Sequence, residues 1–194
     1  MQKTVENLAK AFIGESQARN RYTYYSKTAR EEGYQQIGDL FLITAENEKE
    51  HAKWLMRLMN QLKESGGGFD QITVAEAPVP TVLGSTADNL KAAIAGENYE
   101  RTIMYPGFAD DADADGLPDI AKRLRFIAQA EGHHEERYMK LLEQVQAGTV
   151  FKKDKEVAWV CRECGYVHFG TEPPEKCPSC DHDRGYYEIK CEEY

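Results

Sequence analysis

The chain has 194 residues, which is enough to bury a core and is typical of one or two domains. Its 24 Lys and Arg residues and 33 Asp and Glu residues give a formal net charge of -9, so it lacks the basic face that nucleic-acid binding needs. The longest apolar runs are far shorter than the roughly 20 residues that span a bilayer, and the N-terminus has no apolar segment typical of a secretory signal. The sequence therefore predicts no nucleic-acid or membrane partner and a cytoplasmic location.

Hydrophobic periodicity predicts four helices of roughly 30 residues each. They cover residues 4–32, 35–65, 85–115 and 118–148. Ser85 is the expected cap of the third helix, Pro106 is expected to kink that helix, and Pro118 suits the first turn of the fourth. The glycines and prolines of residues 66–85 predict an extended crossover between the second and third helices.

Short turns within each helix pair and one long connection between the pairs describe an all-α, four-helix, ferritin-like bundle. We assign residues 1–148 to this bundle, 149–156 to a linker and 157–194 to a small C-terminal domain of strands and loops. All five cysteines lie in the last 34 residues, which indicates a separate metal-binding unit and not a disulfide scaffold.

Each predicted helix carries a carboxylate in the middle of the stripe that should be apolar. The first two stripes are Leu8, Ala11, Glu15, Ala18, Tyr22, Tyr25 and Ala29, and Phe41, Thr44, Glu48, His51, Leu55, Leu58 and Leu62. The other two are Leu90, Ala93, Glu97, Glu100 and Met104, and Ile120, Leu124, Ile127, Glu131, His134, Tyr138, Leu141 and Val145. Burying unpaired carboxylates costs several kcal/mol each, and these stripes contain no Lys or Arg. A pair of bound cations is the natural explanation.

Two Glu-x-x-His pairs support this interpretation. Glu48 and His51, like Glu131 and His134, lie about one helical turn apart on one face. One such pair on each of two helices, together with a Glu from each of the other two, is the di-iron or di-manganese carboxylate pattern.

The two halves of the predicted bundle also repeat. Glu97 follows Glu15 by 82 positions, and Glu131 follows Glu48 by 83. The metal site is therefore expected to lie on a pseudo-two-fold axis. Glu100 breaks this symmetry, because an alanine is its counterpart in the first helix.

Several polar residues lie near this pattern without belonging to it. His133 points roughly 200° away from Glu131 and is predicted to be a surface histidine. Tyr22 and Tyr105 lie about two turns past the carboxylates of their own helices, where they could support the ligands or pack as ordinary core tyrosines. The carboxylates assigned to ordinary charged faces are Glu46, Glu50, Glu135 and Glu136.

The C-terminal cysteines form two Cys-x-x-Cys knuckles separated by 12 residues, Cys161 with Cys164 and Cys177 with Cys180. Four thiolates at this spacing bind zinc or one iron tetrahedrally, and the residues alone leave both metals open. Nearby aromatic side chains could wrap the site or form the core of a zinc domain: Trp159, Tyr166, Phe169, Tyr186 and Tyr187. Cys191 lies outside both pairs and is predicted to be a small packed residue or an exposed thiol.

Over its entire length the chain resembles the rubrerythrin family, in which a ferritin-like di-iron bundle precedes a rubredoxin-like domain. The resemblance rests on GESQARNRY, ENEKEHAKW, AGENYERTIMYP and AQAEGHHEER in the bundle, and on CRECGYVHFGTEPPEKCPSC in the C-terminal domain. Asp181 stands where rubredoxins usually carry Gly, and Asp tolerates the left-handed backbone of such a position better than most residues do.

The resemblance implies a non-haem iron peroxidase that reduces hydrogen peroxide to water in oxidative-stress defence. It implies one iron in the four-cysteine site and a di-iron centre held by Glu15, Glu48, Glu97, Glu100, Glu131 and His134. Glu48 and Glu131 would bridge the two irons. In this family one iron is held by the extra carboxylate when ferric and moves toward the opposite histidine when ferrous, and here these would be Glu100 and His51.

The resemblance also implies that electrons reach the di-iron centre through the four-cysteine iron. Their source would be an upstream donor, such as a rubredoxin or an NAD(P)H-dependent reductase. Because the linker is short, we expect contact across a homodimer or larger homo-oligomer. Three alternatives stay open: a ferroxidase or iron-storage protein, a di-metal binding protein with structural zinc, and an oxygen-activating oxidase.

Overall fold

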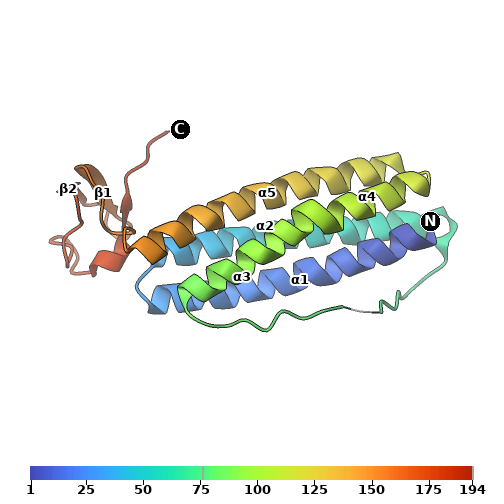
Figure 1. The fold of residues 1–194 in the computed structure, drawn as a ribbon, viewed down its shortest axis with the longest axis horizontal. Coiled ribbons are helices and arrows are strands. Elements are labelled where there is room, and N and C mark those ends of the chain that lie inside the picture. Colours follow the sequence, from blue (N-terminus) through green and yellow to red (C-terminus); the bar gives the residue numbers. More distant parts are fainter. Residues whose placement is uncertain (76, 194) are drawn as a thin grey trace.

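The computed structural model describes residues 1–75 and 77–193, so Glu76 of the predicted crossover and Tyr194 of the predicted C-terminal domain lie outside the described residues. The long helices are α1 (Gln2–Glu31), α2 (Gln35–Leu62), α3 (Thr86–Tyr99), α4 (Tyr105–Ala114) and α5 (Pro118–Ala147). They lie side by side as an elongated bundle, with α4 continuing the line of α3, and a small domain with strands sits at one end (Figure 1). The predicted four-helix, ferritin-like fold with a small C-terminal domain is confirmed.

The bundle core consists of two apolar clusters separated along the helix axes. One cluster includes Leu8, Leu55 and Leu124, and the other includes Tyr22 and Phe41. The carboxylates of the predicted stripes fall between the two clusters in the sequence of each helix, and they are buried. The bundle therefore encloses a polar layer between two apolar ones.

The crossover returns the chain from the end of α2 to the start of α3. The α-helix stops at Leu62, a π-helical turn covers Lys63–Gly67, and Gly66 adopts a φ of 108° that favours glycine. The chain then runs back alongside α1 (Figure 1). The Tyr25 hydroxyl of α1 donates a hydrogen bond of 2.8 Å to the Val82 carbonyl, which fixes the crossover against the bundle.

A π-helical turn, Glu100–Met104, separates α3 from α4. The Tyr105 N–H donates to the Glu100 carbonyl five residues earlier, directly before Pro106, which has no N–H to donate. The interruption expected at Pro106 thus takes the form of a π turn just before it. The predicted cap of α3 is also present, because the Ser85 hydroxyl accepts the Asp88 N–H at 3.2 Å.

The C-terminal domain contains a three-stranded antiparallel sheet of β1 (Val157–Cys161), β2 (Val167–Gly170) and β3 (Tyr187–Ile189), in the order β2-β1-β3. Cys161 of β1 lies opposite Tyr187 of β3. Asp181 follows the second knuckle with a φ of 59°, so the expected left-handed backbone is present there.

This domain contacts the end of the bundle where α1 turns into α2 (Figure 1). Arg162, next to the cysteine Cys161, forms an ion pair with Asp39 of α2. Tyr34 also stacks on Phe151, which precedes the domain and packs against its core, with ring centroids 6.1 Å apart. Gly185 packs so closely on the backbone of the α1–α2 turn that a Cβ would collide with it. The position of the linker at residues 149–156 stays a prediction.

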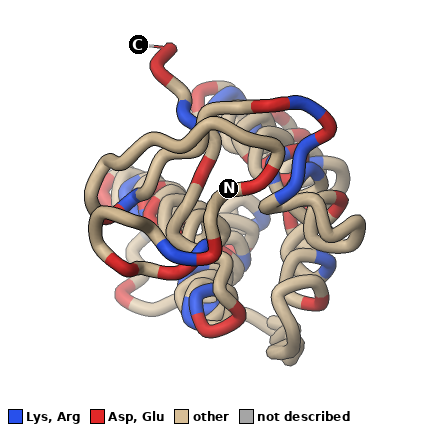
Figure 2. The backbone as a smooth tube through the Cα atoms, turned by 90° about the vertical axis from the view of Figure 1, so that its left-hand side faces the viewer, with Lys and Arg blue, Asp and Glu red and all other residues tan. Residues whose placement is uncertain are grey.

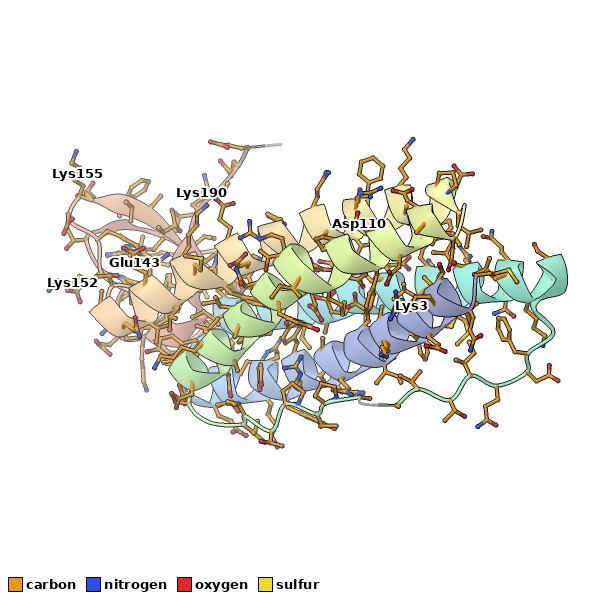
Figure 3. The ribbon with its side chains drawn as sticks, turned by 45° about the vertical axis from the view of Figure 1, so that its right-hand side comes forward. Lys3, Asp110, Glu143, Lys152, Lys155 and Lys190 are labelled. Carbon is orange, nitrogen blue, oxygen red and sulfur yellow. The ribbon has the colours of Figure 1, made fainter. Side chains whose placement is uncertain are left out.

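Positions of acidic and basic residues are interspersed along the backbone (Figure 2). Lys152, Lys155 and Lys190 lie at the end that carries the C-terminal domain, whereas Lys3 and Asp110 lie toward the other end of the bundle (Figure 3). In the described part of the chain, no helix combines the length and the apolar character needed to cross a membrane.

Candidate metal centres

The polar layer of the bundle contains two overlapping groups of possible metal ligands. In each group, one donor atom of every residue lies within 4.8 Å of the others. The groups are Glu15, Glu48, His51 and Glu131, and Glu48, Glu97, Glu131 and His134. Because α1, α2, α3 and α5 all contribute, the layer brings together residues up to 119 positions apart (134 minus 15).

Glu48 and Glu131 belong to both groups and lie between the two histidines. The Nδ1 atom of His51 is 2.9 Å from Glu48 Oε2 and 3.0 Å from Glu131 Oε1. The Nδ1 atom of His134 is 3.2 Å from Glu48 Oε1 and 2.9 Å from Glu131 Oε2. Each carboxylate therefore turns one oxygen toward each histidine, as a carboxylate shared by two cations would.

The outer carboxylates complete a pseudo-symmetric arrangement. Glu15 lies 3.7 Å from His51 Nδ1, and Glu97 lies 3.4 Å from His134 Nδ1. The Tyr105 hydroxyl donates a hydrogen bond to Glu15, and the Tyr22 hydroxyl donates one to Glu97. Tyr105 thus contacts the carboxylate of α1, and Tyr22 of α1 contacts the carboxylate of α3. Residue spacing within one helix does not predict these contacts between helices.

Glu100 is buried, with 7% of its surface exposed, but it belongs to neither group of clustered donors. Its Oε1 atom faces Gly14, where an added Cβ would lie 3.8 Å away, so its carboxylate lies beside the residue that precedes Glu15. Burial, followed by the negative charges of Glu15 and Glu97, raises the pKa of Glu100 well above its usual value. The structure therefore places this extra carboxyl next to the cluster and not within it.

The exposure of the neighbouring polar residues matches the sequence prediction at all but one of them. His133 is exposed as predicted, and so are Glu46, Glu50 and Glu136. The assignment of Glu135 to a charged surface is wrong, because only 7% of it is exposed. Arg101 Nε lies 2.8 Å from its carboxylate and Asn98 donates a second hydrogen bond at 2.8 Å, so the contact of α3 and the following π turn with α5 buries a paired charge.

Tyr138 is a neighbour of the cluster that the sequence pattern predicted only as a core residue. It follows His134 by one turn, is fully buried, and lies with its ring centroid 5.5 Å from that of Tyr22. Burial and the nearby Glu97 carboxylate raise its pKa well above 10. Tyr138 follows the predicted ligand His134 by four residues, and this spacing could have indicated from the sequence that it neighbours the cluster.

The donor atoms of this layer fit a pair of cations. Both oxygens of Glu48 and of Glu131 and the Nδ1 atoms of both histidines are buried without a hydrogen-bond partner among residues 1–75 and 77–193. Leaving so many buried polar atoms unpaired is costly, and each Nδ1 has only one proton to share among three carboxylates. Carboxylate oxygen with imidazole nitrogen is a donor set that suits iron or manganese.

Protonation equilibria in the layer reflect the crowding of carboxylates. Burial and the Glu48 carboxylate raise the pKa of Glu97 to about 8, and burial also raises that of Glu15. Burial alone would lower the pKa of His134, but Glu131 and Glu48 raise it to about 12. Without bound cations the layer therefore retains protons that metal binding must release.

We expect the metal-free protein to lose stability as the pH rises from 4.5 to about 8. Between these values Glu97 is deprotonated in the unfolded chain but protonated in the folded one, so the folded state binds more protons and a rise in pH favours unfolding. His134, whose unfolded value is 6.5, acts in the same direction above that pH. Thermal unfolding of metal-free and iron-loaded protein across this range checks the prediction, since each kcal/mol shifts the Tm by about 2–4 °C. A Tm of the metal-free protein that rises with pH contradicts it.

The four cysteines of the C-terminal domain form a third site. The sulfur atoms of Cys161 and Cys180 are 3.7 Å apart, and those of Cys164 and Cys177 are 3.6 Å apart. Metal–sulfur bonds of about 2.3 Å in a tetrahedron require sulfur–sulfur distances of about 3.8 Å, so the site fits one tetrahedral ion. Cys191 is exposed and lies outside the group, in line with one of its two predicted roles.

The aromatic shell around the cysteines is only partly as expected. Trp159 and Tyr187 are buried against the sulfurs, with 1% of each exposed. Phe169 does not wrap the site, because 66% of it is exposed, and Tyr166 is 36% exposed. The alternation of β2 turns Phe169 away from the cysteines.

Comparisons with known proteins agree with both sites. The family model described as rubrerythrin matches residues 6–142, and the one described as rubrerythrin, rubredoxin-like domain matches residues 159–188. A protein of Methanocaldococcus jannaschii is 62% identical over 195 residues, covering 100% of this chain and 96% of its own length. Rubrerythrin-1 of Clostridium acetobutylicum is 47% identical over 192 residues, covering 99% and 96%.

A solved structure of nigerythrin in a mixed-valence state is also similar. It is 33% identical with a TM-score of 0.63, and the match covers 96% of this chain and 86% of that one. Full-length similarity, the two family models and the two kinds of metal site lead to one conclusion. The chain belongs to the rubrerythrin family, with a di-iron carboxylate site in its bundle and a four-cysteine iron site in its rubredoxin-like domain.

Proposed function

We propose that this protein is a peroxidase that reduces hydrogen peroxide to water, with electrons delivered through the four-cysteine iron. The observation that carries the proposal is that Glu48 and Glu131 each turn one oxygen toward each half of the buried cluster. Two irons held by these residues would, when ferrous, provide the two electrons that reduction of one peroxide requires. The four-cysteine site, in the same chain, is suited to return electrons one at a time.

The proposed ligand set follows the two halves of the cluster. Glu15 and His51 would hold one iron and Glu97 and His134 the other, and Glu48 and Glu131, which belong to both donor groups, would be shared between them. Glu100 would offer an anionic oxygen in place of the His51 imidazole to a ferric ion, because the harder ferric ion favours anionic oxygen. The burial of Glu100 beside the Glu15 end of the cluster supports this exchange.

The surrounding side chains orient the ligands and manage protons. Hydrogen bonds from Tyr22 and Tyr105 hold the carboxylates of Glu97 and Glu15 in place. Reduction of one peroxide to two waters consumes two protons with the two electrons. Burial raises the pKa of Glu100, so its carboxyl retains a proton to a higher pH than an exposed glutamate does and can pass that proton on. The apolar clusters on either side of the layer exclude bulk water.

The position of the rubredoxin-like domain favours delivery between chains. Arg162 anchors the domain at Asp39, and Glu48 lies nine residues farther along α2, a rise of about 14 Å. An electron path from the cysteine site to the cluster of the same chain must cover this length as well as the length of the Arg162 side chain. We therefore propose a homodimer or larger homo-oligomer in which the domain of one chain serves the cluster of another. We also propose a rubredoxin or NAD(P)H-dependent reductase as the upstream donor, and a reducing cytoplasmic location for the thiolate site.

Steady-state peroxide consumption by the iron-loaded protein, with a reductant and without oxygen, tests this function. The proposal predicts one peroxide consumed for every two electrons supplied. Continued uptake of iron far beyond three ions per chain, without turnover, would instead indicate a ferroxidase or storage protein. A zinc-filled cysteine site with no turnover would indicate a di-metal binding protein.

A further inference from the structure

The bundle cluster is most open to solvent at His51. The side chain of His51 is 13% exposed, whereas every other member of the two donor groups has a side chain that is at most 4% exposed. The Nδ1 atom of His51 faces carboxylates of the cluster, among them Glu131 of α5. A small molecule that approaches the cluster from solvent therefore meets it beside this histidine, where α2 faces α5.

Two side-chain contacts join α2 to α5, one on each side of His51 along α2. Before His51 in the chain, Arg137 Nη2 of α5 donates a hydrogen bond of 2.9 Å to Thr44 Oγ1. After His51, the Arg123 guanidinium of α5 lies 3.7 Å from the centroid of the Trp54 ring. The exposed histidine thus lies between two contacts that hold the helices together.

The contact of Trp54 is the nearer of the two. Trp54 follows His51 by three residues, which places it on the same helix face and about 4.5 Å farther along the axis. A guanidinium this close to an indole ring is held there by cation–π attraction. Arg57, one turn farther along α2, lies 5.0 Å from the same ring. The partly buried indole is therefore fixed between α2 and α5, next to the open side of the cluster.

We propose that Trp54, held in place by Arg123, limits the size of the molecules that reach the cluster past His51. With the indole in place, the approach admits hydrogen peroxide and excludes alkyl hydroperoxides that carry a bulky apolar group. Trp54 belongs to neither donor group, so its role is steric. This inference rests on the proposed peroxidase function and adds the class of peroxide that the protein accepts.

The test compares Trp54→Ala with the unaltered protein, both full-length, iron-loaded, reduced and free of oxygen. Stopped-flow absorbance measures the oxidation of bundle iron by hydrogen peroxide and by cumene hydroperoxide. Removal of the indole should raise the rate with cumene hydroperoxide at least about tenfold and change the rate with hydrogen peroxide less than about twofold, because the smaller peroxide already fits. Trp54→Phe, which keeps an aromatic face for Arg123, should retain most of the discrimination.

A second measurement follows the same approach without peroxide. Release of bundle iron from the reduced protein to bipyridine, an aromatic chelator, should be several-fold faster in Trp54→Ala than in the unaltered protein. If peroxide oxidises neither protein while the chelator still removes iron faster from Trp54→Ala, the proposed function fails and the restriction by Trp54 is supported. The two proposals are therefore tested separately.

Tyr24→Ala is the matched control, because it removes an exposed aromatic side chain from α1 and should change neither measurement. If Trp54→Ala does not fold, Arg123→Gln takes its place. That substitution keeps the indole but frees it from α5, and it should shift both measurements in the same direction. An unchanged ratio of the two peroxide rates in the folded variant, whether neither rate rises or both rise equally, overturns the proposal.

Discussion

Replacing Glu48 by Gln should remove the di-iron centre as a functional unit. Bundle iron should fall from about two ions per chain to one or none. Peroxide turnover should fall by more than the about 10–100-fold loss typical of residues that only support metal ligands. The reason is that the two oxygens of Glu48 face different histidines, so one substitution removes charge and a donor from both halves of the cluster. Metal analysis and steady-state peroxide consumption measure the two effects.

Glu50→Gln is the matched control on the same helix. Glu50 is exposed and pairs with Lys53, so its loss should leave iron content and turnover unchanged. Thermal unfolding shows whether the Glu48→Gln bundle still folds. A folded Glu48→Gln protein that binds two bundle irons and turns over at the normal rate would show that Glu48 does not bridge them.

Replacing both Cys161 and Cys164 by Ser should separate electron delivery from peroxide chemistry. Because the two residues supply half of the sulfur ligands, the variant should lose the mononuclear iron and its red colour. Turnover driven by a reductase should fall at least about tenfold, since the electron path is interrupted. The bundle iron, reduced chemically beforehand, should still be oxidised once by peroxide in a stopped-flow experiment.

Cys191→Ser controls for the loss of a thiol as such. Cys191 is exposed and lies outside the four-cysteine group, so this variant should keep its colour and its full turnover. Undiminished reductase-driven turnover in the double variant would show that electrons reach the bundle by another route.

The buried stripes could be predicted from sequence because helical periodicity alone determines which side chains share a face. This is why Glu15, Glu48, Glu97 and Glu131 were expected in one layer, and the structure brings them together. The sequence left open whether Tyr22 and Tyr105 support the ligands or pack as ordinary core tyrosines, and it did not indicate which carboxylate each would contact. Their hydrogen bonds cross between helices, and periodicity carries no information on which helices are neighbours.

A difference between the two halves of the internal repeat indicates the π turn in the sequence. Glu97 follows Glu15 by 82 positions, whereas Tyr105 follows Tyr22 by 83 (105 minus 22). The second half therefore contains one extra residue between its carboxylate and its tyrosine, and the Glu100–Met104 turn accommodates it. The inserted residue lets both Glu97 and Glu100 be buried while Tyr105 still reaches Glu15.

Other features depend on tertiary contacts that a single sequence does not encode. Glu135 was assigned to an ordinary charged face, yet packing of the Glu100–Met104 turn on α5 buries it against Arg101. The stack of Tyr34 on Phe151 likewise requires the docked domain, and the position of Tyr187 opposite Cys161 requires the folded sheet.

The most direct test of the central claim is an anaerobic titration of the fully reduced, iron-loaded protein with hydrogen peroxide, with the metal content measured on the same sample. The proposed function predicts about three iron ions per chain and rapid oxidation of the two bundle irons by about one peroxide per chain. A bundle that binds no iron after anaerobic reconstitution, or diferrous protein that peroxide does not oxidise, would contradict it.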